Sequence, residues 1–431
     1  MMTKTNLGLR TCLIVCLALQ LSASARADVV EFVNGTKVEG QVVARDQESL
    51  TVKTTVGDRT FTRRYTLDKI HAVTTGDQRE VLREKQAEAP AAATTGQERS
   101  KAEVDALIDK LGRAQPEWWD SVAVNYPKTL DLNWPTPPFR QWDNQRYIGQ
   151  YVWDIISPNP NKWREGIRLM HHLLGVHKDN AELRSRAMNE LGRMYFDFLH
   201  DYARAAFWWR TAGVETDDAY RHGVSLAECY WRLGNKQMAL DLLDKLPAQF
   251  PMIKLWAEMG ELQKALAMAD ANATGQLADM ACIYAGDACR VAGQHEQAVK
   301  YYEKVLAVPA SGFASRRVLR NQQRAQASLE AIRLFDSLDL KRVADGAYRA
   351  SSLGYEAPVG VEVTVRGGRI EAVRVVEHHE KQYYTAMTDT PEKIIAKQSV
   401  QGIDATSGAT LTSQAIIHAT AKALAQGMKQ Q

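Results

Sequence analysis

The sequence of 431 residues predicts a multidomain fold, with a small all-β barrel, a central all-α solenoid of helical hairpins and a C-terminal α+β domain. Three observations predict this. Apolar residues alternate with period two near the N-terminus, recur with helical spacing through the middle, and return to strands before a final helix. The predicted boundaries are a signal peptide over 1–27, the barrel over 28–78, a linker over 79–101, the solenoid over 102–340 and the last domain over 341–431.

The first 27 residues have the pattern of a secretory signal peptide. Lys4 and Arg10 provide positive charge, Thr11–Leu21 an apolar core, and Ala25-Arg26-Ala27 a cleavage site before Asp28. An uncleaved membrane anchor is the alternative, but the apolar run is shorter than the ~20 residues that span a bilayer. We expect an exported protein, periplasmic or extracytoplasmic, that is soluble or peripherally membrane-associated after cleavage.

Composition excludes several classes of function. A formal net charge of +3 gives no case for nucleic-acid binding.

Three cysteines remain after removal of the signal: Cys229, Cys282 and Cys289. This is an odd number, and Cys282 and Cys289 lie too far apart on one helix to form a disulfide. We expect buried thiols. No Cys-x-x-Cys-His or cysteine cluster is present, so we expect neither c-type haem nor a metal site.

Residues 28–78 read as five short strands, which suggests a small barrel. Asn34-Gly35 is a strong signal for a two-residue hairpin. The pattern weakly resembles Sm-like or Src-homology-like barrels. The charged and Ala/Thr-rich stretch over 79–101 has no core-forming residues, so it reads as a linker.

Residues 102–340 are helical throughout and contain degenerate repeats. One example combines small and large residues in the order Leu226, Tyr230, Gly234, Ala239 and Leu243. This order resembles tetratricopeptide (TPR) hairpins, in which Gly and Ala let paired helices approach. Such repeats imply a protein partner on the solenoid. All ten Trp lie between Trp118 and Trp256, and we expect them mainly in the inter-helix core.

Near the C-terminus, hydroxyl residues crowd around one Gly-Ala pair within Asp404–Ser413, and an apolar-periodic segment follows. This order predicts a tight turn and a helix with Ser or Thr at its N-cap. Unpaired N–H groups at a helix start suit a phosphate, although a capped helix after a polar loop is the simpler interpretation.

The run Ser407-Gly408-Ala409-Thr410-Leu411-Thr412 resembles the S/T-G-A-T-x-T flavinylation motif of the FMN-binding domain family. The family occurs in sodium-translocating NADH:quinone reductases, in Rnf complexes and in exported flavin carriers. The resemblance implies that Thr412 carries covalent FMN through a phosphoester made from FAD by a flavin transferase. It also implies that Ser407, Gly408, Ala409, Thr410 and Leu411 shape the loop and hold the phosphate, and that Asp404 opens the motif.

The resemblance extends over about the last ninety residues, through Asp345-Gly346-Ala347-Tyr348, Gly354-Tyr355 and two strands, Val359–Arg366 and Glu371–Glu377. His378, His379 and Glu380 stand where the family often has H-x-E-T, and they are candidate contacts to the isoalloxazine ring. The Thr of that motif and the longer glycine-rich insert are missing here.

These features favour an exported electron-transfer flavoprotein over a stand-alone enzyme, with periplasmic or membrane redox proteins as partners. Thr412 is then an acceptor in one maturation step, not a catalytic residue in turnover. A secreted repeat-protein scaffold, whose FMN domain is vestigial or binds FMN non-covalently, is the second hypothesis. A flavin reductase is a third, but no G-x-G-x-x-G follows a predicted strand. No hydrolase or kinase motif is present.

Overall fold

A computed structural model describes residues 28–32, 37–46, 48–56, 59–67, 70–76, 78–82, 98–134, 141–217, 221–335, 337–355, 357–380, 385–403, 405–406 and 409–428. The chain divides into two compact units, residues 1–88 and residues 89–431, which are taken separately below. The predicted signal peptide over 1–27 and the hairpin turn at Asn34-Gly35 lie outside the described residues.

The N-terminal unit is an antiparallel sheet in the order β4-β3-β2-β1-β5-β6. Its alternating pattern puts Val30, Leu50, Val52, Ile70 and Val73 into one small core. The described pairings leave β4 and β6 at the two ends of this order, and closure into a barrel stays a prediction. The strands are β1 (Asp28–Phe32), β2 (Lys37–Arg45), β3 (Ser49–Val56), β4 (Arg59–Thr66), β5 (Ile70–Thr75) and β6 (Gln78–Val81).

The five predicted strands correspond to β1–β5, while β6 was not predicted. It starts at Gln78, the last residue assigned to the barrel, and runs into the stretch read as a linker. Its four side chains are exposed, so the apolar alternation that marked the other strands is absent from it.

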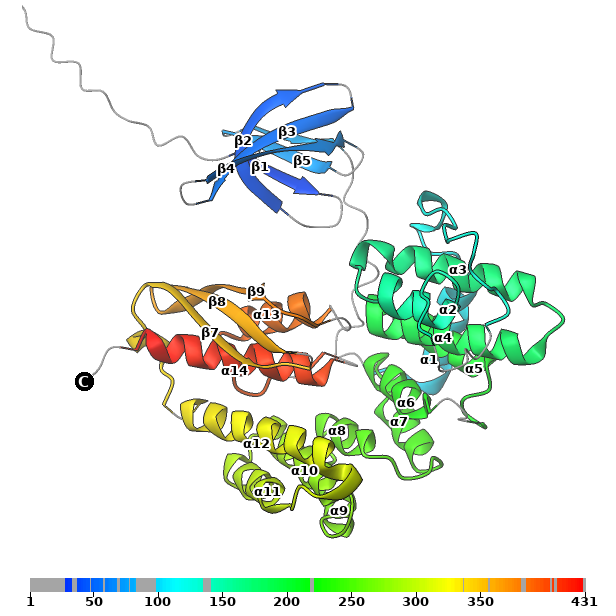
Figure 1. Cartoon of the computed structure of the whole chain (residues 1–431), viewed down its shortest axis with the longest axis vertical. Coiled ribbons are helices and arrows are strands. Elements are labelled where there is room, and N and C mark those ends of the chain that lie inside the picture. The colour runs from blue at the N-terminus through cyan, green and yellow to red at the C-terminus, as the bar shows by residue number, and fades with distance from the viewer. Residues whose placement is uncertain are drawn as a thin grey trace, which may run out of the picture. The chain divides into compact units, whose positions relative to one another are not determined.

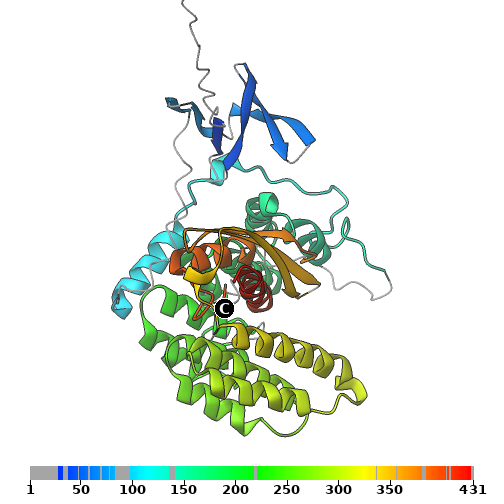
Figure 2. The same cartoon turned by 90° about the vertical axis from the view of Figure 1, so that its left-hand side faces the viewer.

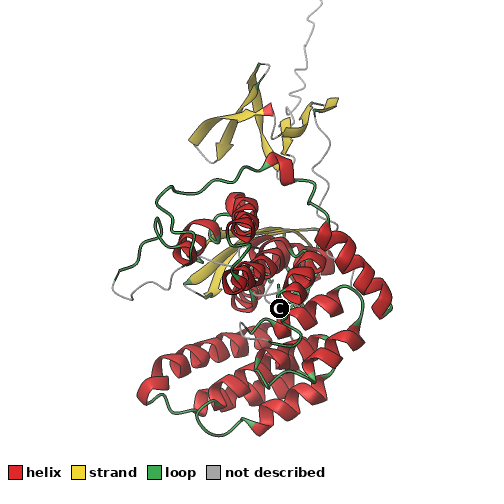
Figure 3. Cartoon of the chain, turned by 90° about the vertical axis from the view of Figure 1, so that its right-hand side faces the viewer, coloured by secondary structure: helices red, strands yellow, loops and turns green. Residues whose placement is uncertain are grey.

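The larger unit begins with helices, shown red in Figure 3 around a small yellow sheet. Helix α1 starts at Lys101, behind a capping box in which Ser100 and Glu103 bond each other's backbone N–H groups. The α-helices are α1 (Lys101–Arg113), α2 (Ile148–Tyr151), α3 (Trp163–Val176), α4 (Ala181–Leu199), α5 (Tyr202–Thr211), α6 (Gly223–Arg232), α7 (Lys236–Leu243), α8 (Pro251–Glu258), α9 (Leu262–Ala271), α10 (Ala278–Val291), α11 (His295–Ala307) and α12 (Ser315–Phe335).

Neighbouring helices pair as hairpins, and the green-to-yellow helices stack in succession in Figure 2. Glycines set the closest approaches. A Cβ on Gly192 of α4 would lie 2.4 Å from the Trp209 ring of α5, and one on Gly286 of α10 would lie 2.5 Å from Tyr302 of α11. This is the small-against-large packing that the repeat pattern predicts; the assignment to tetratricopeptide repeats stays a prediction. Cys229, Cys282 and Cys289 are free and buried, as expected.

The chain ends in a three-stranded antiparallel sheet, β7-β8-β9, with two helices. Helix α14 packs on β7 and β8, α13 packs on β9, and α12 runs beside α14 (Figure 1). Valines of β8, from Val359 to Val365, join residues of α10 to α12 in one hydrophobic core, so the sheet and the later helices form a continuous body. The elements are β7 (Gly346–Leu353), β8 (Pro358–Arg366), β9 (Arg369–Glu377), α13 (Ala386–Lys397) and α14 (Thr410–Gln426).

Membrane-spanning character is absent from the described helices. None of them combines the length and the apolar composition that crossing a bilayer requires.

Candidate functional site

Helix α14 begins inside the hydroxyl-rich motif. It starts at Thr410, and the N-cap residue is Ala409, whose side chain makes no capping hydrogen bond. The prediction of Ser or Thr at the N-cap was therefore wrong. The nearby hydroxyls have other partners, because Ser413 Oγ accepts from Thr406 N at 3.0 Å and thereby fastens the preceding loop to the helix. The first N–H groups of the helix still have no acceptor within the helix itself.

The motif's last threonine is paired with a carboxylate. Thr412 Oγ1 donates to Glu380 Oε2 at 2.7 Å. Both side chains are almost inaccessible to solvent, with Thr412 1% and Glu380 2% exposed. A hydrogen bond to a charged group inside a protein is stronger than one at the surface, so this contact holds the hydroxyl in one direction.

The second oxygen of Glu380 is held by the turn after β7. Tyr355 N donates to Glu380 Oε1 at 2.7 Å. A Cβ on Gly354 would lie 2.4 Å from that same oxygen and 2.5 Å from the carbonyl oxygen of Ala357. Glycine is therefore the residue that leaves room for the carboxylate at this turn. Three segments distant in sequence meet here: the β7–β8 turn, the end of β9 and the start of α14.

A second group of polar side chains braces the loop before α14. We call it the hydroxyl cluster; it consists of Thr390, Thr406 and Ser413 with the carboxylate of Asp389. Thr406 Oγ1 donates to Asp389, and Thr390 Oγ1 donates to Ser413 Oγ at 3.1 Å. All three hydroxyl residues are completely buried. Sequence reasoning did not assign Asp389 or Thr390, because nothing in the sequence pattern links the start of α13 to a loop sixteen residues further on.

The remaining predicted site residues divide into two sets. His378 and His379 follow the end of β9, directly before Glu380; His379 is exposed and His378 is half-buried. Of these three residues, Glu380 is the one whose hydrogen bond to the motif is described, through Thr412. Asp404, Ser407 and Gly408 lie outside the described residues. Among the described residues, no group of three His, Cys, Asp or Glu side chains could hold a metal ion.

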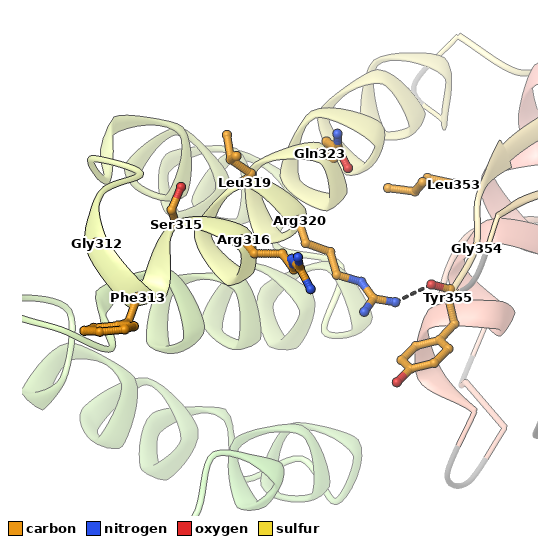
Figure 4. Close-up of a pocket in the computed structure, with 10 residues that line it drawn as sticks. All are labelled: Gly312, Phe313, Ser315, Arg316, Leu319, Arg320, Gln323, Leu353, Gly354 and Tyr355. Carbon is orange, nitrogen blue, oxygen red and sulfur yellow. Dashed lines mark hydrogen bonds between the residues drawn. The ribbon is translucent and has the colours of Figure 1, made fainter. Parts of the chain in front are cut away.

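A broad hollow of about 830 Å³ lies between the start of α12 and the end of β7, and Tyr355 is one of the residues that line it (Figure 4). The guanidinium of Arg320 donates to Tyr355 O and lies 4.3 Å from the centroid of the Tyr355 ring. Arg316 and Phe313 also line the hollow, and Phe313 is fully exposed. The hollow is therefore joined to the Thr412–Glu380 pair through the backbone of Tyr355.

The C-terminal part of the chain matches a known protein family. Residues 354–425 match the FMN-binding domain family. An uncharacterized protein of Treponema pallidum (strain Nichols) is 42% identical over 84 residues, which cover 19% of this chain and 23% of the relative. No solved structure matches the chain. The matched range contains Gly354, Glu380 and Thr412, and it supports a C-terminal FMN-binding domain in a flavin-binding protein.

Proposed function

We propose that the chain is an exported flavoprotein that carries FMN in phosphoester linkage on Thr412 and relays electrons outside the cytoplasm. The observation that carries the proposal is the buried Thr412–Glu380 pair, with its 2.7 Å hydrogen bond, inside the region that matches the FMN-binding domain family. When bound, FMN supplies the electron-transfer chemistry, and the protein supplies position and electrostatics.

The site residues suit this cofactor in two ways. Thr412 lies in the first turn of α14, where the helix N-terminus favours a phosphate. Glu380 holds the Thr412 hydroxyl and is itself oriented by Tyr355 N. In a maturation step, Glu380 would accept the proton of Thr412 Oγ1 as this oxygen displaced AMP from the FMN phosphorus of FAD.

Export and electron relay are the broader parts of the proposal. Export is supported by the signal-peptide pattern over 1–27. A covalent bond would keep FMN from being lost in a compartment that does not make it. The partners would be a flavin transferase during maturation, redox proteins of the periplasm or membrane during turnover, and a protein bound to the helical repeats.

Mass spectrometry tests the proposal most directly. The full chain is produced with a flavin transferase in an exporting host, and its intact mass and peptides are measured. We expect the mass of one FMN minus one water on the peptide that contains Thr412, together with flavin fluorescence of the denatured band. Thr412→Ala should lose both signals, while Thr388→Ala, which removes an exposed hydroxyl of α13 outside the motif, should keep them.

A bare wild-type Thr412, with the transferase active on a control substrate, would overturn the proposal. The secreted scaffold would then be the better interpretation. Direct oxidation of NADH by the purified protein would favour the reductase hypothesis instead.

A further inference from the structure

A cavity of about 400 Å³ lies between the helical repeats and the start of α14. Thr410 and Leu411 contribute to its wall from α14. The rest of the wall comes from the helical part of the chain, from α4, α5, α6, α8, α10 and α12 and the loops before α6 and α8. Its volume falls within the range of about 300–1,000 Å³ that small-molecule and cofactor pockets occupy.

The helical wall touches both segments that flank the Thr412–Glu380 pair. On one side, Thr410 and Leu411 directly precede Thr412, and consecutive Cα atoms are ~3.8 Å apart. On the other side, Thr385, five residues after Glu380, donates from Oγ1 to Asp197 O of α4 at 3.3 Å. The helical part of the chain therefore contacts the motif at Thr410 and Leu411 and the segment after Glu380 at Thr385, while the lining residues described for the cavity include neither Thr412 nor Glu380.

The charges around the cavity favour an anionic occupant. Its lining contains the four basic side chains of Arg193, Arg221, Lys254 and Arg324, against the acidic side chains of Asp197 and Glu228. Arg193 contacts Glu190 at 2.5 Å and Asp197 at 3.3 Å. Lys254 contacts Glu258 at 2.6 Å, and Arg324 contacts Asp287 at 3.2 Å, so these three cations are partly neutralised. Positive charge is nevertheless in excess among the lining side chains.

Arg324 adds an observation of its own. One guanidinium nitrogen lies 3.2 Å from Asp287 Oδ2. The Nε of Arg324 is buried without a hydrogen-bond partner among the described residues. A buried donor without an acceptor costs about 1–3 kcal/mol. The aromatic residues Trp209 and Tyr284 also line the cavity and offer surface to a planar ring system.

We propose that the helical repeats form one wall of the flavin site, and that this cavity takes the flavin that Thr412 carries. The inference rests on the proposed function and adds to it a role for the repeats. Basic side chains near a flavin favour the negative charge that reduction adds, and so they raise the reduction potential. The repeats would then set the potential of the cofactor as well as bind a partner.

The test uses the full chain with its flavin transferase, and it starts by confirming the FMN mass on Thr412 in every variant. Arg324→Gln and Arg221→Gln each remove one positive charge from the cavity, and Ser225→Trp fills it from α6. Arg316→Gln is the matched control, because Arg316 lies eight residues before Arg324 on the same helix but lines the hollow of Figure 4. The readouts are the midpoint potential and the visible circular dichroism of the flavin, with thermal unfolding as a check of folding.

We expect both cavity charge variants to lower the midpoint potential, Ser225→Trp to change the flavin circular dichroism, and Arg316→Gln to leave both readouts unchanged. FMN on Thr412 with unchanged readouts in all three cavity variants would overturn this inference alone. A shift only in Arg316→Gln would also overturn it, because it places the flavin in the other hollow. Absence of FMN from wild-type Thr412 would overturn the proposed function and this inference together.

Discussion

Two threonines of the hydroxyl-rich stretch Asp404–Ser413 have different surroundings. Thr406 and Thr412 are both completely or almost completely buried, and the hydroxyl of each donates to a carboxylate, Asp389 or Glu380. Thr406 is also tied into the hydroxyl cluster through its backbone N–H, and Asp389 is paired with Lys393 at 2.9 Å. The carboxylate of Thr412 is instead held by the backbone N–H of Tyr355, beside a glycine.

Under the proposed function, the difference separates a structural role for Thr406 from a chemical role for Thr412. A hydroxyl within a network of several partners stabilises a loop, since displacing it breaks more than one hydrogen bond. A hydroxyl that donates to one oriented carboxylate has the arrangement of a nucleophile and its base. The same residue type in the same motif is therefore expected to fail in different ways when it is changed, and the predictions below test this contrast.

The largest effect is expected at the carboxylate of Thr412. Glu380→Gln removes the proton acceptor while keeping the side-chain shape, so the rate of FMN attachment should fall about 10²–10⁴-fold, the usual contribution of a general base. Asp389→Asn, at the carboxylate of Thr406, should attach FMN at close to the wild-type rate once folded. Time courses of the intact mass with purified transferase measure both. Equal rates for Glu380→Gln and wild type would remove the distinction between the two threonines.

The second-largest effect is expected at Gly354, which leaves space for the carboxylate of Glu380. Gly354→Ala places a Cβ 2.4 Å from Glu380 Oε1 and 2.5 Å from a backbone oxygen, so the carboxylate must move. We expect at least about a tenfold slower attachment, because small displacements of a reacting group are costly. Gly175→Ala is the matched control, since nothing lies within 4 Å of its added Cβ. Unchanged attachment in Gly354→Ala would show that the position of Glu380 is unimportant.

The hydroxyl cluster should give a change in stability without a change in chemistry. Ser413→Ala removes the acceptor of both Thr406 N and Thr390 Oγ1, and it should lower the free energy of unfolding by about 1–3 kcal/mol. Thr388→Ala, at an exposed hydroxyl of α13, should change it by less than about 0.5 kcal/mol. Denaturant unfolding measures both variants. If the folded Ser413→Ala protein no longer accepted FMN, the cluster would have a chemical role after all.

The smallest effect is expected at a third carboxylate, in the helical wall. Burial raises the pKa of Asp197 from 3.8 to about 6, against the opposing effect of Arg193. Because the folded state favours the protonated form, the free energy of unfolding contributed by this group falls as pH rises from about 4 to 6. Asp197→Asn should therefore gain about 2 kcal/mol relative to wild type between pH 4.5 and pH 7.5. Glu190 and Glu228 also raise this pKa, so Glu190→Gln should shift the window to lower pH. A constant difference between Asp197→Asn and wild type at the two pH values would contradict the raised pKa.

Local patterns in the sequence predicted the elements that carry the site, but they did not predict the hydrogen bonds between its distant segments. The helix at Thr410, the strands β8 and β9 and the candidate residue Glu380 follow from local signals and from the family resemblance. The N-cap was wrong because the hydroxyls that favour capping are used by partners in other segments. Asp389 and Thr390 were missed because a hydrogen-bond network between α13 and the loop before α14 leaves no periodic trace in the sequence.

By itself, the sequence determined the order of the elements, the buried thiols and the place of the hydroxyl-rich motif at a helix start, because these depend on periodicity, propensity and neighbouring residues. Only the tertiary structure decided which carboxylate meets Thr412, and that α4, α5, α6, α8, α10 and α12 line a cavity together with Thr410 and Leu411 of the same motif. Both are contacts between residues far apart in the chain, and they depend on how α4, α12, β9 and α14 pack rather than on any local signal.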